Sequence, residues 1–236
     1  MNAARFEGFQ PEAIHFLLEL SGNNDRTWFQ PRKAEYERLL KDPLEALCMA
    51  LGERFADRGI PLNADVRSPF RIYRDIRFSK DKSPYKTHVS ASFPWVAEGH
   101  GVLHSRGKPE SVHQVGAYFH FQPDAGYAGG GMWHPERPVL DAWRALVATH
   151  PRRVHAAIDD PAFVAEFGQV EGDRLSRVPA GFRADDPNAE LLKLKDVIFG
   201  RPVPDEEALS PDLPDILANA FAKATPVLRL LAELPA

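Results

Sequence analysis

Cysteine, long apolar runs and common nucleophile motifs are scarce or missing in this sequence. Cys48 is the single cysteine among 236 residues, which excludes an internal disulfide and a Cys-x-x-Cys metal site. No segment reaches the roughly 18 apolar residues of a membrane span, and residues 1–10 hold no apolar run of signal-peptide length. Gly-x-Ser-x-Gly and P-loop motifs are also missing. We therefore expect a cytoplasmic protein that contacts no membrane and uses no serine or cysteine nucleophile.

The overall charge is slightly acidic, with a formal net charge of −4 and a pI near 6.1. Domains that bind nucleic acid generally have a pI above ~9, so general nucleic-acid binding is not expected. The hydrophobic content of 44% is ordinary for a globular protein, and 236 residues fit around one core. We therefore predict a single domain over residues 1–236.

The spacing of apolar residues predicts helices at both ends of the chain and strands in the middle. Alternation of apolar and polar residues predicts three strands, over 70–78, 87–95 and 115–122, and a polar, glycine-rich loop between 97 and 112. Helical spacing predicts a helix that carries Trp28 to Leu40, a short helical piece near Phe163, and further segments at 11–20, 42–59, 138–149, 152–158, 190–195, 211–224 and 226–234. Helices, consecutive strands and more helices indicate an α+β fold with an antiparallel sheet.

The segment from Arg71 to His88 stands out by its charge. It contains six basic and two acidic residues, so it carries +4 while the rest of the chain carries −8. If the three predicted strands pair, the odd-numbered residues of the first strand share a polar face with His88, Tyr118 and His120. Guanidinium and ammonium groups bind phosphate or carboxylate, and imidazole transfers protons near neutral pH. This pattern predicts a pocket for a small anionic ligand.

Individual roles follow from side-chain chemistry. We predict that Asp75, His88 and His120 act as general acid or base if the site is catalytic. Arg74 has the parity of the apolar face, so we predict a structural role in which it reaches a carboxylate or a helix terminus across the core. The predicted ligand-binding residues are Arg71, Tyr73, Arg77, Lys82, Lys86 and Tyr118.

Three other interpretations of these residues stay open. The basic segment could be a solvated hairpin whose charges pair with one another. It could also bind nucleic acid or protein, with tyrosines stacking on bases, although the net acidity argues against nucleic acid. His88, His113 and His120 could bind a metal for hydrolysis, but no tight histidine spacing supports this, and we predict no metal site.

No motif identifies a cofactor. Gly129–Gly131 is interpreted as a tight turn or, as an alternative, an anion cradle.

Several motifs resemble a widespread bacterial and fungal family of conserved domains of unknown function. They are SGNNDRTWF, FRIYRDIRFSKDKSPYKTHVSASF, YFHFQP, GGGMW and PAGFRADDPNAELLKLK, and the similarity extends from about Phe9 to Leu231. The long central motif, which contains most of the predicted site residues, is the most specific. The resemblance implies membership of the family and no particular reaction or ligand.

Overall fold

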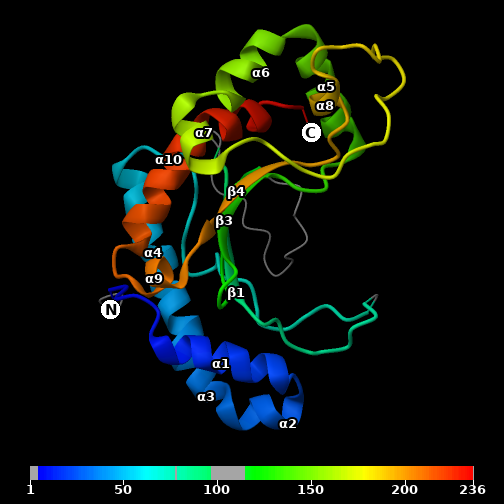
Figure 1. Cartoon of the computed structure of the whole chain (residues 1–236). Helices are drawn as coiled ribbons and strands as arrows, with labels where there is room; N and C mark the ends of the chain where they lie inside the picture. Colours follow the sequence, from blue (N-terminus) through cyan, green and yellow to red (C-terminus); the bar gives the residue numbers. More distant parts are fainter. Residues whose placement is uncertain (1–4, 78, 97–114, 236) are drawn as a thin grey trace. The chain divides into compact units, whose positions relative to one another are not determined.

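The structure is a computed structural model that describes residues 5–77, 79–96 and 115–235. Over these residues the chain has four strands in one antiparallel sheet, with helices before and after them in the sequence (Figure 1). The strands follow the order β1-β2-β3-β4, so each is hydrogen-bonded to its neighbour along the chain. The predicted α+β fold is confirmed. The predicted loop over 97–112 lies outside the described residues.

The helical segments occur in two groups. Those before the sheet are α1 (Pro11–Gly22), α2 (Arg26–Phe29), η1 (Gln30–Arg32), α3 (Lys33–Tyr36), η2 (Glu37–Lys41) and α4 (Asp42–Asp57). The strands are β1 (Val89–Pro94), β2 (Gly116–Phe121), β3 (Gly126–Met132) and β4 (Val197–Val203). The later helices are α5 (Arg137–Thr149), α6 (Pro151–Ile158), α7 (Pro161–Phe167), α8 (Ala189–Leu192), α9 (Asp205–Leu209) and α10 (Leu213–Ala232).

The chain forms two compact units, and we describe each by itself. Unit 1 comprises Met1–Phe93, Tyr118–Ala128 and Pro202–Asn219, and unit 2 comprises Pro94–Ala117, Gly129–Arg201 and Ala220–Ala236. The single-domain organisation of residues 1–236 stays a prediction. No helix among the described residues is long and apolar enough to cross a membrane.

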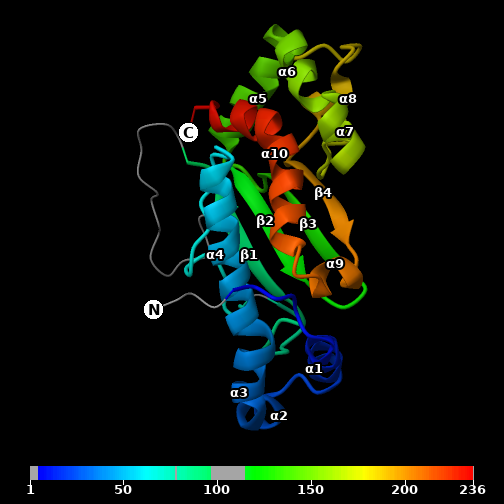
Figure 2. The same ribbon diagram turned by 90° about the vertical axis from the view of Figure 1, so that its left-hand side faces the viewer.

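The core of unit 1 forms where α4 packs against the sheet. Leu47, Leu51 and Phe55 recur at helical spacing along α4 and are fully buried. Phe55 meets Phe93 of β1 edge-on, with ring centroids 5.9 Å apart. Figure 2 shows α4 in front of β1. The apolar side of the sheet is therefore covered in this unit, which leaves its other side for polar residues.

Alternation along β1 and β2 decides which residues occupy that polar side. The side chains of Val89, Ala91, Phe93, Ala117, Phe119 and Phe121 are buried. The intervening residues Tyr118 and His120 are only half-buried, as the predicted period of two requires. The predictions for these two strands are therefore confirmed.

The predicted strand is wrong over residues 70–77, and residue 78 lies outside the described residues. This segment makes only isolated antiparallel bridges, Pro69 to Ala91 and Tyr73 to Tyr85. Pro69 and Tyr73 are four positions apart, whereas their partners Ala91 and Tyr85 are six positions apart. The pairing between the two bridges therefore cannot be regular. Further out, the Asp75 carboxylate accepts a hydrogen bond from the Arg77 amide, which competes with strand pairing. We refer to residues 70–88 as the arm.

The glycine triplet is not the predicted turn but part of β3. A Cβ atom on Gly130 would lie 2.6 Å from the Gly116 carbonyl oxygen, and one on Gly131 would lie 2.1 Å from that of Val197. Gly131 also has a φ of 118°, which disfavours other residues. The glycines therefore permit close approach of neighbouring strands. The sequence analysis missed β4 altogether.

The predicted helix start at Asp42 is confirmed as the first residue of α4. The backbone is helical on both sides of Asp42, however, so this residue is not the predicted cap. A second predicted helix boundary is wrong. At the other end, one helix, α10, replaces the two predicted segments and contains Pro226 in its interior.

Unit 2 has its own aromatic core. Trp143 of α5, Phe163 of α7 and Phe199 of β4 are fully buried. Phe163 and Phe199 meet edge-on, with ring centroids 5.2 Å apart. The Trp143 indole nitrogen donates to the Leu191 carbonyl oxygen at 3.2 Å, which ties α5 to α8.

Candidate functional site

The base of the arm is attached to the turn between α1 and α2. The Asn24 amide nitrogen donates to the Tyr85 carbonyl oxygen, and the Tyr85 amide donates to the Asn24 side-chain oxygen, both at 3.0 Å. The buried Tyr85 ring also stacks on Phe29, with centroids 4.0 Å apart. Several of the motif residues shared with the family therefore hold the arm in place.

Residues 86–88 connect the arm to β1 and carry the central groups of the site. The two extra residues lie somewhere between Tyr85 and Ala91, an interval that includes this stretch. An irregularity of this kind redirects side chains relative to a regular strand. Lys86 and His88 are both half-buried here, immediately before the first residue of β1.

Aromatic and imidazole rings cover the polar side of the sheet in unit 1. The His88 and His120 ring centroids are 5.2 Å apart, and His120 stacks on Tyr127 of β3 at 5.7 Å. Tyr118 lies 5.6 Å from His120 and 6.3 Å from Phe70. We call this surface the histidine face, and it comprises Phe70, Lys86, His88, Ser90, Tyr118, His120 and Tyr127.

The histidine face is a poorly neutralised cationic environment. Burial, followed by the positive charge of neighbouring His120 and Lys86, lowers the pKa of His88 from 6.5 to about 4. Burial and the nearby Arg71 also lower the pKa of Lys86. Among the described residues, neither Lys86 nor Arg71 has a carboxylate within ion-pair distance. An anion bound here would relieve the repulsion between these groups.

Lys86 is held against the face by an aromatic ring. Its ammonium nitrogen lies 5.1 Å from the centroid of the Phe70 ring, a cation–π distance. Phe70 therefore lies on the polar side with Tyr118, whereas its parity predicted the apolar side. The irregular pairing of the arm explains why simple alternation fails for this residue.

The hydrogen bonding of His120 determines its tautomer. Its Nε2 lies 2.8 Å from the Ala125 carbonyl oxygen, which only accepts hydrogen bonds. Nε2 therefore carries the hydrogen, and Nδ1 carries the lone pair when the ring is neutral. Burial lowers the pKa of His120, and the bond to Ala125 partly opposes this shift. Both imidazoles are thus neutral at pH 7, each with a lone pair that can accept a hydrogen bond.

Tyr118 and Ser90 contribute hydroxyl groups to the same surface. Burial raises the pKa of Tyr118, and a hydrogen bond with buried Ser90 partly opposes this effect. Tyr118 is therefore a neutral hydroxyl group. The sequence analysis missed the role of Tyr127, because the segment that contains it was not recognised as a strand. The turn sequence Pro123-Asp124-Ala125-Gly126, between two alternating runs, was the signal that could have identified it.

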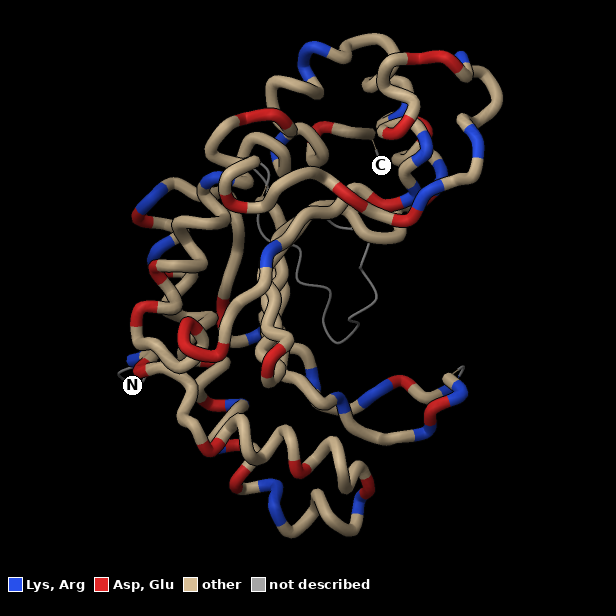
Figure 3. Tube along the Cα trace, in the orientation of Figure 1, with Lys and Arg blue, Asp and Glu red and all other residues tan. Residues whose placement is uncertain are grey.

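The distal part of the arm carries Asp75, Arg77 and Lys82. The Nε and Nη2 atoms of Arg77 donate hydrogen bonds to Asp75 Oδ1 and Oδ2, at 3.0 and 2.6 Å. Both side chains are exposed. These bonds lower the pKa of Asp75 to about 2. Lys82 donates to the Ile76 carbonyl oxygen at 2.9 Å. Figure 3 shows acidic residues among more numerous basic residues along the arm, and Asp75 and Asp81 each form an ion pair within it. The contacts of Asp75 therefore suit positioning of Arg77 more than proton transfer with the imidazoles.

Arg71, Tyr73 and Arg74 lie closer to the base of the arm. Arg71 and Tyr73 are exposed, and Tyr73 contacts the Tyr85 ring at 5.5 Å. Arg74 does reach a carboxylate, but it is Asp81 of the same arm and not a group across the core. The hydrogen bond from the Ser83 hydroxyl, followed by the one from Arg74, lowers the pKa of Asp81. Arg71 thus borders the histidine face, and Arg74 stabilises the shape of the arm.

The described residues contain no cluster of three or more His, Cys, Asp or Glu side chains that could hold a metal ion. His88 and His120 are close together, whereas His113, the third residue of the metal hypothesis, lies outside the described residues. The chemistry that the histidine face offers is therefore cationic binding of an anion, hydroxyl hydrogen bonding and proton transfer by imidazole.

Comparison with known proteins places the chain in a family. The sequence model for the conserved hypothetical protein family DUF2461 matches residues 12–229, which is most of the chain. No curated protein and no solved structure is significantly similar. The match agrees with the resemblance seen in the motifs. The chain belongs to the DUF2461 family of conserved hypothetical proteins.

Proposed function

We propose that the histidine face binds a small molecule that carries a phosphate or carboxylate group. The observation that supports this most strongly is the pair of cations, Lys86 and Arg71, without a carboxylate partner among the described residues. Burial and mutual repulsion destabilise the charge on Lys86. An anionic ligand removes that penalty, because opposite charges at short range favour the charged form.

Polar groups around Lys86 give the surface specificity. The Tyr118 hydroxyl can donate to anionic oxygens, and Arg71 is exposed at the border of the face. A guanidinium group pairs with phosphate or carboxylate through two parallel hydrogen bonds. The ligand we propose is small, because the unpaired charges of Lys86 and Arg71 lie near one another at the histidine face.

If the bound molecule reacts, the imidazoles are the acid–base groups. His88 is neutral at pH 7 because its pKa is about 4, so it can accept a proton from the ligand or from water. His120 is oriented by Ala125, with Nδ1 as the acceptor. Lys86 and Arg71 would then stabilise negative charge on the reacting group. Asp75 is not one of these acid–base groups, since its carboxylate is hydrogen-bonded to Arg77.

A matched pair of lysine variants tests the proposal. Calorimetric titration with inorganic phosphate should show binding to the wild-type protein, and Lys86→Met should weaken it about tenfold, the value of one charge-assisted hydrogen bond. Lys82→Met removes the same charge from an exposed position on the arm, and its effect should be less than about twofold. Equal losses in both variants, or no binding by the wild type, would contradict the proposal.

A further inference from the structure

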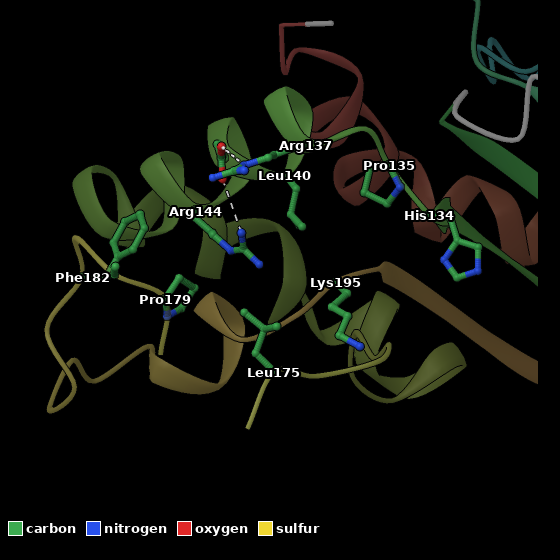
Figure 4. Close-up of a pocket in the computed structure, with 11 residues that line it drawn as sticks. His134, Pro135, Arg137, Leu140, Arg144, Leu175, Pro179, Phe182 and Lys195 are labelled. Atoms are coloured by element: carbon green, nitrogen blue, oxygen red, sulfur yellow. Dashed lines mark hydrogen bonds and ion pairs between the residues drawn. The ribbon is translucent and has the colours of Figure 1, made fainter. Parts of the chain in front are cut away.

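A second candidate site lies in unit 2, in a part of the chain that the histidine face does not include. A pocket of about 550 Å³ is lined by residues from the start of α5, the segment 175–182 and Lys195 (Figure 4). Every lining residue belongs to unit 2. His134, just after the glycine-rich strand β3, is one of them.

His134 is held by a buried carboxylate. The Nδ1 atom of its ring lies 3.0 Å from Asp196 Oδ1, and its backbone amide donates to the same oxygen at 2.6 Å. The Asp196 side chain is 3% exposed, whereas that of His134 is 58% exposed. Because a carboxylate accepts hydrogen bonds, the neutral ring carries its hydrogen on Nδ1 and its lone pair on Nε2. This is the arrangement by which a carboxylate orients an imidazole for proton transfer.

The backbone around this pair adopts unusual conformations. His134 has a φ of 48°, in the left-handed region that residues other than glycine rarely occupy. Its ring stacks on the exposed Trp133 ring, with centroids 4.1 Å apart. Gly172 lets a neighbouring segment approach Asp196, since a Cβ atom there would lie 2.3 Å from the Asp196 carbonyl oxygen. Such local strain is common where a side chain must be placed for function.

The walls of the pocket combine positive charge with apolar surface. The buried Arg144 guanidinium donates to the carbonyl oxygens of Leu192 and Leu194, at 3.1 and 3.3 Å, so its position is well defined. Lys195 is exposed and forms no ion pair with a described residue. Leu175 and Phe182 supply apolar surface. Figure 4 shows Lys195 and His134 toward one end of the pocket and Phe182 at the other.

Acidic groups offset only part of this charge. Asp141 is the one carboxylate among the lining residues, and it pairs with both Arg137 and Arg144. Lys195 therefore remains as a positive charge at the end of the pocket that contains the His134 imidazole. A ligand that satisfies all of these groups has an anionic end near Lys195 and an apolar body against Leu175 and Phe182.

We propose that this pocket binds small aryl carboxylates or aryl phosphates, with Lys195 pairing with the anion beside the oriented His134 imidazole. Asp196 is a positioning residue, which fixes the tautomer and orientation of the imidazole. The pocket works independently of the histidine face, because it uses none of its residues.

Titration with phenylacetate and phenyl phosphate, followed by NMR of the histidine ring signals, tests this site. Saturable binding of at least one compound should shift the His134 signals, and Lys195→Met should weaken that binding about tenfold. Lys193→Met is the matched control: it makes the same change two residues away, outside the pocket, where the lysine pairs with Glu190. Its effect should be less than about twofold.

Two further variants separate this site from the histidine face and from a purely structural role. His88→Gln should leave unchanged both the His134 shifts and the ligand concentration at which those shifts are half complete. Asp196→Asn should alter the tautomer of His134 or the size of its ligand-induced shift, which a residue that only stabilises the fold would not do. The proposal is overturned if neither compound saturates, if Lys193→Met weakens binding as much as Lys195→Met, or if the response follows His88.

Discussion

At the scale of single residues, His88 shows how burial and charge work together. An imidazole surrounded by water titrates near pH 6.5, but burial and the positive charge of His120 and Lys86 bring the pKa of His88 to about 4. His88 is therefore neutral in the folded protein over a pH range in which it is protonated in the unfolded chain. That difference links the stability of the protein to pH.

The sign of this link yields a prediction. Between pH 6.5 and about 4 the unfolded chain binds a proton at this histidine and the folded protein does not, so stability falls as pH falls through this window. His88→Gln removes the titration while keeping a polar side chain. Urea unfolding at several pH values should therefore show a shallower loss of stability for His88→Gln than for the wild type.

His155→Gln is a suitable control for this experiment. Hydrogen bonds with Asn188 and Asp159 raise the pKa of His155, so its contribution is present at low pH and is lost as pH rises. Its replacement should steepen the loss of stability on acidification, which is the opposite effect. If His88→Gln and the wild type lose stability in parallel, His88 is not held in its neutral form.

The residues of the histidine face were only partly predictable from the sequence. His88, Tyr118 and His120 follow from alternation along β1 and β2, because a period of two assigns each residue to a side without knowledge of the fold. The positions of Phe70 and Tyr127 do not follow from alternation, since Phe70 belongs to the irregular arm and Tyr127 to the glycine-rich strand β3. Their placement depends on which segments pair, and that is a long-range property.

At the scale of elements, the arm shows where local patterns mislead. Residues 70–78 alternate as a strand does, yet their polar side chains find partners within the arm. Asp75 binds the Arg77 amide and Asp81 binds the Ser83 amide, so backbone donors are satisfied without a neighbouring strand. A sequence shows the alternation, but it does not show which of two competing sets of hydrogen bonds is more stable.

The attachment of the arm gives a second prediction. Asn24→Ala removes both hydrogen bonds to the Tyr85 backbone and leaves part-buried groups without partners, which should cost about 1–3 kcal/mol of unfolding free energy. Asn23→Ala removes one exposed bond, to the Glu19 carbonyl oxygen, and should cost less than about 0.5 kcal/mol. Chemical denaturation of the two variants measures both values.

The Asn24 and Asn23 variants also test whether the hydrogen bonds between Asn24 and Tyr85 position the residues of the histidine face. If Tyr85 positions the stretch 86–88, Asn24→Ala should weaken phosphate binding as well as stability, whereas Asn23→Ala should change neither. Equal destabilisation by the two substitutions would show that the Asn24–Tyr85 bonds do not hold the arm.

Helices were predicted better than strands, for a related reason. Apolar spacing identified α1 and α4, because a helix satisfies its hydrogen bonds within one segment. The triplet Gly129–Gly131 suggested a turn, but its function depends on the distance to Gly116 and Val197, residues far away in the sequence. Pro226 suggested a helix start, yet the packing of α10 tolerates it in the interior.

At the scale of the whole molecule, charge distribution favours a small ligand. The segment 71–88 carries +4 within a chain of net charge −4, so the rest of the chain carries −8. A long polyanion would also meet the acidic remainder. In addition, several of the arm's charges are already paired, as between Arg77 and Asp75 and between Arg74 and Asp81. Few cations are therefore left for extended phosphate contacts.

The most direct test of the histidine face is an NMR titration of the His88 imidazole with and without inorganic phosphate. Without phosphate, its pKa should be about 4. With saturating phosphate, the anion should favour the imidazolium form and raise that pKa clearly, while the pKa of His155, which is outside the face and is raised by hydrogen bonds with Asn188 and Asp159, should not change. A His88 pKa that is the same with and without phosphate would contradict the account.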